Sequence, residues 1–178
     1  CCHIPFRDGS GGNHPNTRYR QQVPNLLSEY KEAHLMIGHT HKNRNWIHTV
    51  NGKRIYEHIH GAVCGGMWHS TFNSDGTPNG YGIYEIEGNT IANWLYKATG
   101  YSEDMQIRAY DGGQKYYDPR YSKNQPSKKH TYSEYTFGRP GCVVANIWNI
   151  EHGDWDVALW QNGKEICKMT KIGGNDWW

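Results

Sequence analysis

The sequence reads AHLMIGHTH from Ala33 to His41. Its first five residues form a short apolar run, which stops at Gly38 and is followed by two histidines one residue apart. A run of this length before a turn signal is typical of a buried strand, and the glycine lets the backbone turn where a Cβ would clash. We therefore expect a strand over residues 33–37 that presents His39 and His41 at a sheet edge, where neutral imidazoles favour borderline transition metals.

A strand end, a loop and a helix are expected before this run. The chain opens with CCHIPF, which indicates the end of a buried strand, and residues 22–32 are expected to form a short helix. The apolar stripe expected on this helix consists of Leu26, Leu27 and Tyr30. Because strands joined through a helix often lie side by side, we expect His3 to meet His39 and His41 at one point of a sheet edge.

Residues 45–97 are expected to be mainly antiparallel β structure. Side chains alternate with period two here, and Asn51-Gly52 is a type I′ hairpin signal. A second hairpin is expected across residues 87–89, and a short apolar strand over residues 61–68. Together with the preceding strand and helix, this order predicts an α+β protein that is mostly β.

The chain is expected to divide near residue 104. Residues 100–140 are polar and rich in tyrosine, with little periodicity, and are expected to form loops. The strands expected after them cover residues 143–150, 156–160 and 165–171, with a turn at 152–154 and a hairpin at Asn162-Gly163. We therefore expect residues 1–104 to form one domain and residues 105–178 to form a small all-β, sandwich-like domain.

Charge and composition argue against several classes of protein. Lys and Arg number 19 and Asp and Glu number 17, and no basic stripe typical of nucleic-acid-binding proteins is present. No stretch approaches the run of about 18 apolar residues that a membrane-spanning helix needs. The 5 cysteines include no C-x-x-C zinc pattern. They allow at most two disulfides, and buried free thiols are the alternative.

The segments around His3 and His39 resemble the last two motifs of calcineurin-like metallophosphoesterases. In that family the catalytic domain ends with a lone histidine and then with G-H-x-H. Further stretches resemble a bacterial branch of the family: YEH at 56–58, GAVCGGMW at 61–68, DGTPNGY at 75–81 and YKATGY at 96–101. The resemblance is close over residues 1–110 and loose over 111–178. It implies the C-terminal half of a four-layer α/β phosphoesterase sandwich, followed by a small β domain.

The resemblance also implies a reaction and a set of ligands. It implies that the parent protein hydrolyses phosphate mono- or diesters with two divalent metal ions (Mn, Fe or Zn), which activate a water for in-line attack and offset the developing charge. His3 and His39 would share one metal, and His41 would serve the other. A periplasmic or cell-surface location is implied as well.

The carboxylate motifs of the family are missing from this chain. It contains no D-x-H and no G-D-x-x-D, and Gly12-Asn13-His14 is followed by Pro15 where the family has an acid. Without a bridging carboxylate, two close cations repel one another. We therefore expect a fragment that is inactive alone and binds at most one metal ion weakly.

Weaker candidates lie downstream of these motifs. His58 and His60 fall on one face of a strand, because side chains alternate with period two. They are expected either to line the active-site rim together with Trp68, or to orient a metal ligand. The alternatives are a half-exposed strand face for the two histidines and ordinary aromatic packing for the tryptophan.

Two other classes of protein remain open. A single-metal, cupin-like protein would place a glutamate soon after H-x-H, and residues 42–48 contain no acid. A non-catalytic β-rich module that binds carbohydrate or protein would give the strand–helix–strand unit at residues 1–39 no role. An incomplete sandwich leaves an open sheet edge and apolar surface, so self-association or a partner chain that completes the domain is expected.

Overall fold

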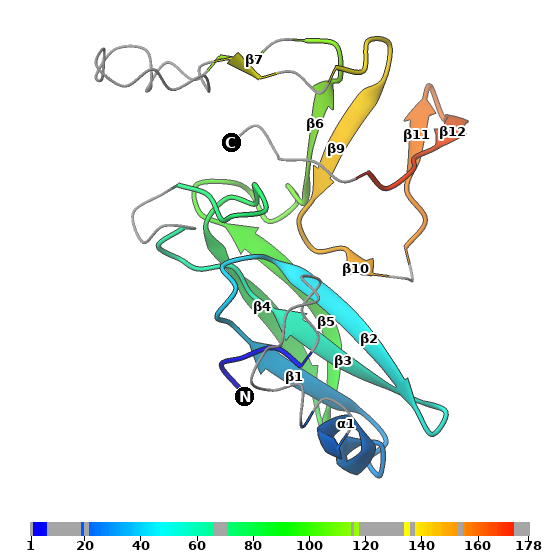
Figure 1. Ribbon diagram of the computed structural model, residues 1–178. Coiled ribbons are helices and arrows are strands. Elements are labelled where there is room, and N and C mark those ends of the chain that lie inside the picture. The colour runs from blue at the N-terminus through cyan, green and yellow to red at the C-terminus, as the bar shows by residue number, and fades with distance from the viewer. Residues whose placement is uncertain are drawn as a thin grey trace.

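The computed structural model describes residues 2–6, 19, 22–65, 71–114, 116–117, 134–135, 138–152 and 155–172 (Figure 1). Strands dominate this part of the chain, and its α-helix, α1 (Gln22–Leu27), is short. The expectation of a mostly β protein of the α+β class is therefore confirmed.

A four-stranded sheet carries the candidate histidines, and its strand order is β1-β3-β2-β10. Its strands are β1 (Ala33–Ile37), β2 (Arg44–Val50), β3 (Lys53–Ile59) and β10 (Glu151–His152). β1 runs parallel to β3, and β2 and β3 form an antiparallel hairpin. Asn51 and Gly52 have φ values of 50° and 72°, as a type I′ turn requires. The expected strand over residues 33–37 and this hairpin are both confirmed.

One face of this sheet is apolar and is covered by the N-terminal segment and α1. The core on this side consists of Phe6, Ala33, Leu35, Ile37, Ile55 and Ile59. Val23 and Leu27 of α1 pack against this core, because residues four apart lie on one face of a helix. The expected stripe was wrong for Leu26 and Tyr30, each 64% exposed. The helix ends at Leu27, earlier than expected.

The other face is covered by the hairpin of β4 (Gly80–Glu87) and β5 (Thr90–Ala98), which confirms the turn expected at residues 87–89. Tyr84 of β4 and Trp94 of β5 lie edge-on to the ring of His58, with ring centroids 5.2 Å away in each case. The sheet is thus enclosed between two layers, α1 on one side and β4–β5 on the other.

The remaining strands lie above the sheet in Figure 1. They are β6 (Ile107–Asp111), β7 (Tyr116–Tyr117), β8 (Glu134–Tyr135), β9 (Val143–Ile147), β11 (Ala158–Gln161) and β12 (Lys164–Lys168). The hairpin at Asn162-Gly163 is confirmed by β11 and β12.

Three expectations about strands were wrong. Residues 107–111 form a strand where loops were expected, and this strand, β6, pairs with β9. The turn expected at residues 152–154 was wrong at His152, which belongs to β10. Residues 61–65 form no strand, and residues 66–68 lie outside the described residues.

A second small core joins the two halves of the chain. It consists of Tyr96, Ala98 and Trp148, all almost fully buried. Trp148 comes from beyond residue 104, so packing crosses the expected domain boundary. The division into residues 1–104 and 105–178 stays a prediction.

The described cysteines are Cys2, Cys64, Cys142 and Cys167, and all four are unpaired and exposed. The alternative of buried thiols is therefore wrong for these residues. No helix within the described ranges is long and apolar enough to cross a membrane.

Candidate functional site

His3 and His39 lie side by side at the end of β1. The backbone around His3 runs along the outer edge of this strand. Cys2 N donates to Met36 O at 3.1 Å, and Gly38 N donates to His3 O at 3.2 Å. His39 Nδ1 then lies 3.1 Å from His3 Nε2, with the rings at 78° to one another. The structure thus brings together two of the three histidines that the sequence singled out.

The turn after β1 is made by the histidines themselves. His39 and His41 have φ values of 74° and 51°, in the left-handed region that costs a non-glycine residue about 1–3 kcal/mol. A Cβ at Gly38 would lie 3.7 Å from His3 Nδ1, which is an ordinary contact. The expectation that Gly38 makes the turn possible was therefore wrong. Such strain persists only where the surroundings fix the backbone.

His41 is fixed by a distant turn. Ser74 donates to His41 O from its backbone N–H at 3.0 Å and from its hydroxyl at 2.8 Å. The sequence predicts a turn at residues 75–80 and includes residues 75–81 in the family resemblance, but it indicates no partner for the turn, because nothing local shows what a turn contacts.

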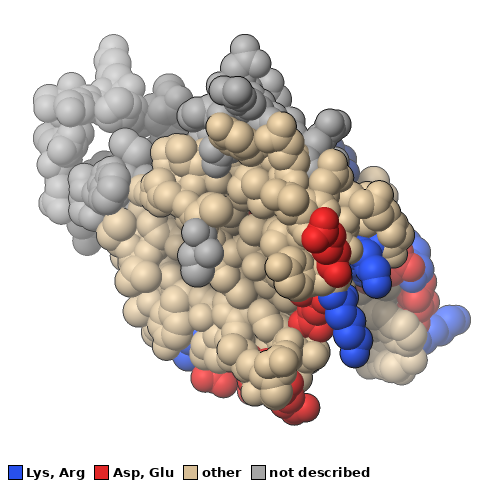
Figure 2. All heavy atoms as spheres, turned by 90° about the horizontal axis from the view of Figure 1, so that it is seen from below, with Lys and Arg blue, Asp and Glu red and all other residues tan. Residues whose placement is uncertain are grey.

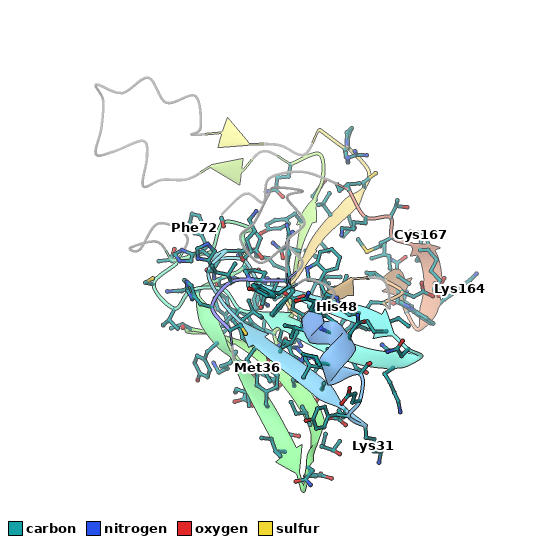
Figure 3. The ribbon with its side chains drawn as sticks, turned by 60° about the horizontal axis from the view of Figure 1, so that its bottom comes forward. Lys31, Met36, His48, Phe72, Lys164 and Cys167 are labelled. Atoms are coloured by element: carbon teal, nitrogen blue, oxygen red, sulfur yellow. The ribbon has the colours of Figure 1, made fainter. Side chains whose placement is uncertain are left out.

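The segment that carries His3 is anchored by Glu57, whose side chain is fully buried. Phe6 N donates to Glu57 Oε1 at 2.7 Å, and His48 Nε2 donates to Glu57 Oε2 at 2.5 Å. Figure 3 labels His48 of β2, whose side chain is 10% exposed. A buried carboxylate is stable only when such donors replace its water. Sequence reasoning missed this anchor, because a glutamate between Tyr56 and His58 gave no signal of burial.

His58 lies in the interior and has no exposed surface. It therefore does not form part of a solvent-exposed rim, and a half-exposed strand face was wrong for it as well. The β4–β5 hairpin, whose position over the sheet no local pattern predicts, covers this face. The other role expected of His58, orienting a metal ligand, stays a prediction.

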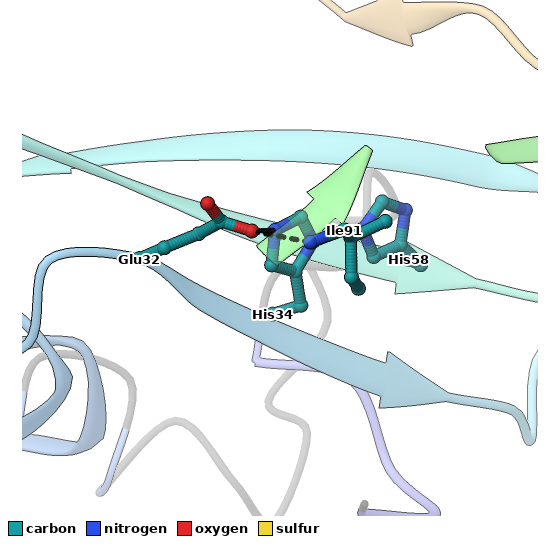
Figure 4. A network of polar contacts seen from close by, with 4 residues as sticks. All are labelled: Glu32, His34, His58 and Ile91. Atoms are coloured by element: carbon teal, nitrogen blue, oxygen red, sulfur yellow. Dashed lines mark hydrogen bonds and ion pairs between the residues drawn. The ribbon is translucent and has the colours of Figure 1, made fainter. Parts of the chain in front are cut away.

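Four side chains form a row of hydrogen-bonding contacts on this face of the sheet: Glu32, His34, His58 and Asn45 (the first three are drawn in Figure 4). Both ends of the row are acceptors. Asn45 presents Oδ1 to His58, because Asn45 Nδ2 donates to the backbone oxygen of Asn149 at 3.2 Å. Three contacts between two acceptors need three hydrogens, whereas two neutral imidazoles supply two.

Burial works against a third proton in this row. Burial is the main cause that lowers the pKa of His34, and the hydrogen bond and charge of Glu32 partly offset this shift. Burial, followed by the charges of His34 and His60, lowers the pKa of His58 to about 3. Both rings are therefore neutral at pH 7, and one of the three contacts lacks a hydrogen.

His60 lies next to the end of β1, where the backbone N–H of His60 donates to Ile37 O at 2.9 Å. Its ring contacts the Tyr84 hydroxyl, with Nε2 2.6 Å from the oxygen. Burial lowers the pKa of His60 and raises the pKa of Tyr84, so neither side chain is charged at pH 7. A Cβ at Gly82 would lie 2.5 Å from His60 Cε1, so this close approach requires glycine. Trp68 lies outside the described residues.

The geometry of His3 and His39 fits a shared metal ion. Two imidazole nitrogens that each lie about 2.0–2.1 Å from one ion are roughly 3.3 Å apart in tetrahedral geometry, and here they are 3.1 Å apart. Among the residues that the structure describes, no three His, Cys, Asp or Glu side chains gather closely enough to hold a metal. The pair could therefore hold an ion only together with further ligands, which the described residues do not bring close to it.

The surface charge has no single sign on the face that Figure 2 draws. Most of this face belongs to residues other than Lys, Arg, Asp and Glu, and the acidic and basic side chains lie next to one another. Steering of a polyanion depends on a patch of one sign, and this face presents no such patch among the residues shown in colour.

Comparison with known proteins identifies a family for this chain. A family model described as the C terminal of calcineurin-like phosphoesterase matches residues 57–177. No curated protein and no solved structure matches the chain. The matched region begins at Glu57, after the three candidate histidines, and it includes the turn that holds His41.

Proposed function

Because this chain belongs to the family of calcineurin-like phosphoesterase C-terminal regions, we propose that it forms part of an enzyme that hydrolyses phosphate mono- or diesters. The observation that carries the proposal is the contact between His3 and His39, whose facing nitrogens are 3.1 Å apart. Two residues 36 positions apart in the chain meet at a sheet edge, where α/β folds place functional groups.

His3 Nε2 and His39 Nδ1 would hold one divalent metal ion, and His41 would contribute to the site of a second. Bound Mn, Fe or Zn supplies a nucleophile from water at neutral pH and polarises the phosphoryl oxygens. The two facing nitrogens must both be free of hydrogen to act as ligands. The hydrogens of the neutral rings then reside on His3 Nδ1 and His39 Nε2.

The carboxylate motifs of such a site are absent from this sequence. The chain contains no D-x-H and no G-D-x-x-D, and two close cations repel unless anionic charge lies between them. We therefore propose that this chain alone is inactive and binds at most one metal ion, weakly. A periplasmic or cell-surface location, and self-association or a partner chain that completes the domain, stay predictions.

Hydrolysis of bis-p-nitrophenyl phosphate with Mn²⁺ tests the proposal. We expect no turnover by residues 1–178 alone, and turnover once they are joined to a segment that supplies the D-x-H and G-D-x-x-D motifs. His39→Ala in this longer protein should abolish activity, because it removes a ligand, whereas His130→Ala, outside the family motifs, should not. Efficient turnover by residues 1–178 alone would contradict the proposal that the chain is inactive without the carboxylate motifs. A fully active His39→Ala variant would contradict the assignment of His39 as a metal ligand.

A further inference from the structure

The carbonyl group of His41 is held by two donors from one residue. The backbone N–H and the hydroxyl of Ser74 both donate to it, at 3.0 and 2.8 Å. Two donors on one carbonyl oxygen restrict rotation of the peptide plane that follows His41. This contact therefore acts directly on the backbone of a residue whose φ is 51°.

Ser74 belongs to a turn that is itself fixed by Asp75. Asp75 Oδ1 accepts from Thr77 N at 3.1 Å, which closes the turn, and Asp75 Oδ2 accepts from Asn43 N at 2.7 Å. The turn thus contacts the loop of residues 38–43, which we call the histidine loop, at two places. One contact is at His41 and the other is at Asn43.

The turn is attached to β6 and β9, and the loop is attached to the residue directly after β9. Arg108 of β6 donates from Nη2 to Gly76 O at 2.8 Å, and Asn146 of β9 donates from Nδ2 to Asp75 O at 2.9 Å. On the loop side, Asn43 Nδ2 donates to Trp148 O. A continuous set of hydrogen bonds therefore runs from the β6–β9 ladder through the turn to His41.

We propose that Ser74, Asp75 and Asn146 are positioning residues for His41, and that β6 and β9 serve to hold the histidine loop in its left-handed conformation. The physical reason is that a non-glycine residue keeps a positive φ only where its surroundings impose it. The region that the family model matches would then act on histidines that lie outside it. The consequence for metal binding rests on the proposed function, whereas the consequence for the backbone does not.

The first test uses the metal-free chain, so that it does not depend on a metal site. A positive φ gives a strong NOE between the amide and Hα protons of His41. We expect this NOE to weaken in Ser74→Ala and in Asn146→Ala, to recover in Ser74→Thr, which restores the hydroxyl, and to be unchanged in Asn93→Ala. Asn93 is an exposed residue of β5. Ser74 is also exposed, so its substitution should leave the protein folded.

The second test measures Zn²⁺ affinity from amide chemical shifts. We expect Kd for the ion held by His3 and His39 to rise about fivefold in Ser74→Ala, because the loop that carries His39 loses one hydrogen bond at His41. We expect a rise of about 10- to 100-fold in Ser74→Ala/Asn146→Ala. Ser74→Thr should bind like the unmodified chain, and so should Asn93→Ala.

The outcomes separate the two proposals. An unchanged His41 NOE in both Ser74→Ala and Asn146→Ala would overturn the positioning role, whether or not the chain binds zinc. A chain that binds no Zn²⁺ at all, or binds it equally well as His39→Ala, would overturn the metal assignment and leave the NOE result to decide the positioning role.

Discussion

At the scale of single residues, Glu57 is a buried acid on a strand of an otherwise apolar face. Moving a carboxylate out of water costs several kcal/mol, and here the N–H groups of Phe6 and His48 offset this cost. Both donors belong to other segments, so Glu57 joins the N-terminal segment, β3 and β2. The stability of the His3 segment should therefore depend on this one side chain.

Glu57→Ala should lower the free energy of unfolding by about 2–4 kcal/mol, because it removes the acceptor from two buried donors and leaves a cavity. Glu57→Gln keeps the shape and one acceptor, so its loss should be smaller. Urea unfolding followed by tryptophan fluorescence measures both. Glu85→Ala is the matched control, since Glu85 is an exposed residue of β4 and its removal should change stability by less than about 0.5 kcal/mol. Equal stability of Glu57→Ala and Glu85→Ala would contradict the anchor.

At the scale of elements, β3 places a buried acid on one face of the sheet and a buried histidine on the other. Glu57 points to the side covered by α1, and His58 points to the side covered by β4–β5. The row of Glu32, His34 and His58 ties β1 to β3 and, through Glu32 and Ile91 N at 2.9 Å, to β5. The packing of these layers should therefore respond to pH.

Stability should fall as pH decreases below about 6.5. The pKa of His58 is about 3 in the folded protein and 6.5 ordinarily, so between these values the unfolded chain binds a proton that the folded chain does not. Stability therefore decreases on acidification, by up to about 1.4 kcal/mol per pH unit for this one group. His34 and His60, whose pKa values are also lowered, act in the same direction.

Urea unfolding at several pH values between 5 and 7 measures this slope. Asp75, whose pKa is raised by burial, contributes in the opposite direction, and comparison with His58→Gln removes this contribution because both proteins contain Asp75. His58→Gln can still donate to Asn45 and accept from His34 but cannot bind a proton, so its slope should be shallower. Identical slopes for the two proteins would show that His58 is not the source.

At the scale of the whole molecule, one tryptophan connects the two halves of the chain. Trp148 packs with Tyr96 and Ala98 in a small core, and its ring lies edge-on to Tyr101 at 5.7 Å. Because the residues before and after position 104 share this core, we expect them to unfold together.

Trp148→Ala should lower stability by about 3–5 kcal/mol, the usual effect of removing a buried aromatic ring. Trp160→Ala is the matched control, because Trp160 is 59% exposed and its loss should have little effect. Thermal unfolding by circular dichroism measures both, together with residues 1–104 produced alone. A fragment 1–104 as stable as the whole chain would instead support two independent domains.

The sequence by itself determined what depends on neighbours in the chain. Asn51-Gly52 and Asn162-Gly163 specify tight turns because the backbone angles of a hairpin are a local property, and the strand before Gly38 was visible from its apolar run. The meeting of His3 and His39 was expected from the rule that strands joined by a helix lie side by side. The strand expected at the start of the chain was wrong for residues 2–6, which form no strand and are held to β1 by backbone hydrogen bonds at Cys2 and His3.

Only the tertiary structure decided the contacts between distant residues. The pairing of β6 with β9, the burial of Glu57 and His58, and the hold of Ser74 on His41 join residues far apart in the chain. No local pattern encodes such a partner, because a side chain's burial and hydrogen bonds depend on which segment the whole fold brings against it. The histidines could therefore be found from the sequence, whereas the residues that fix their geometry could not.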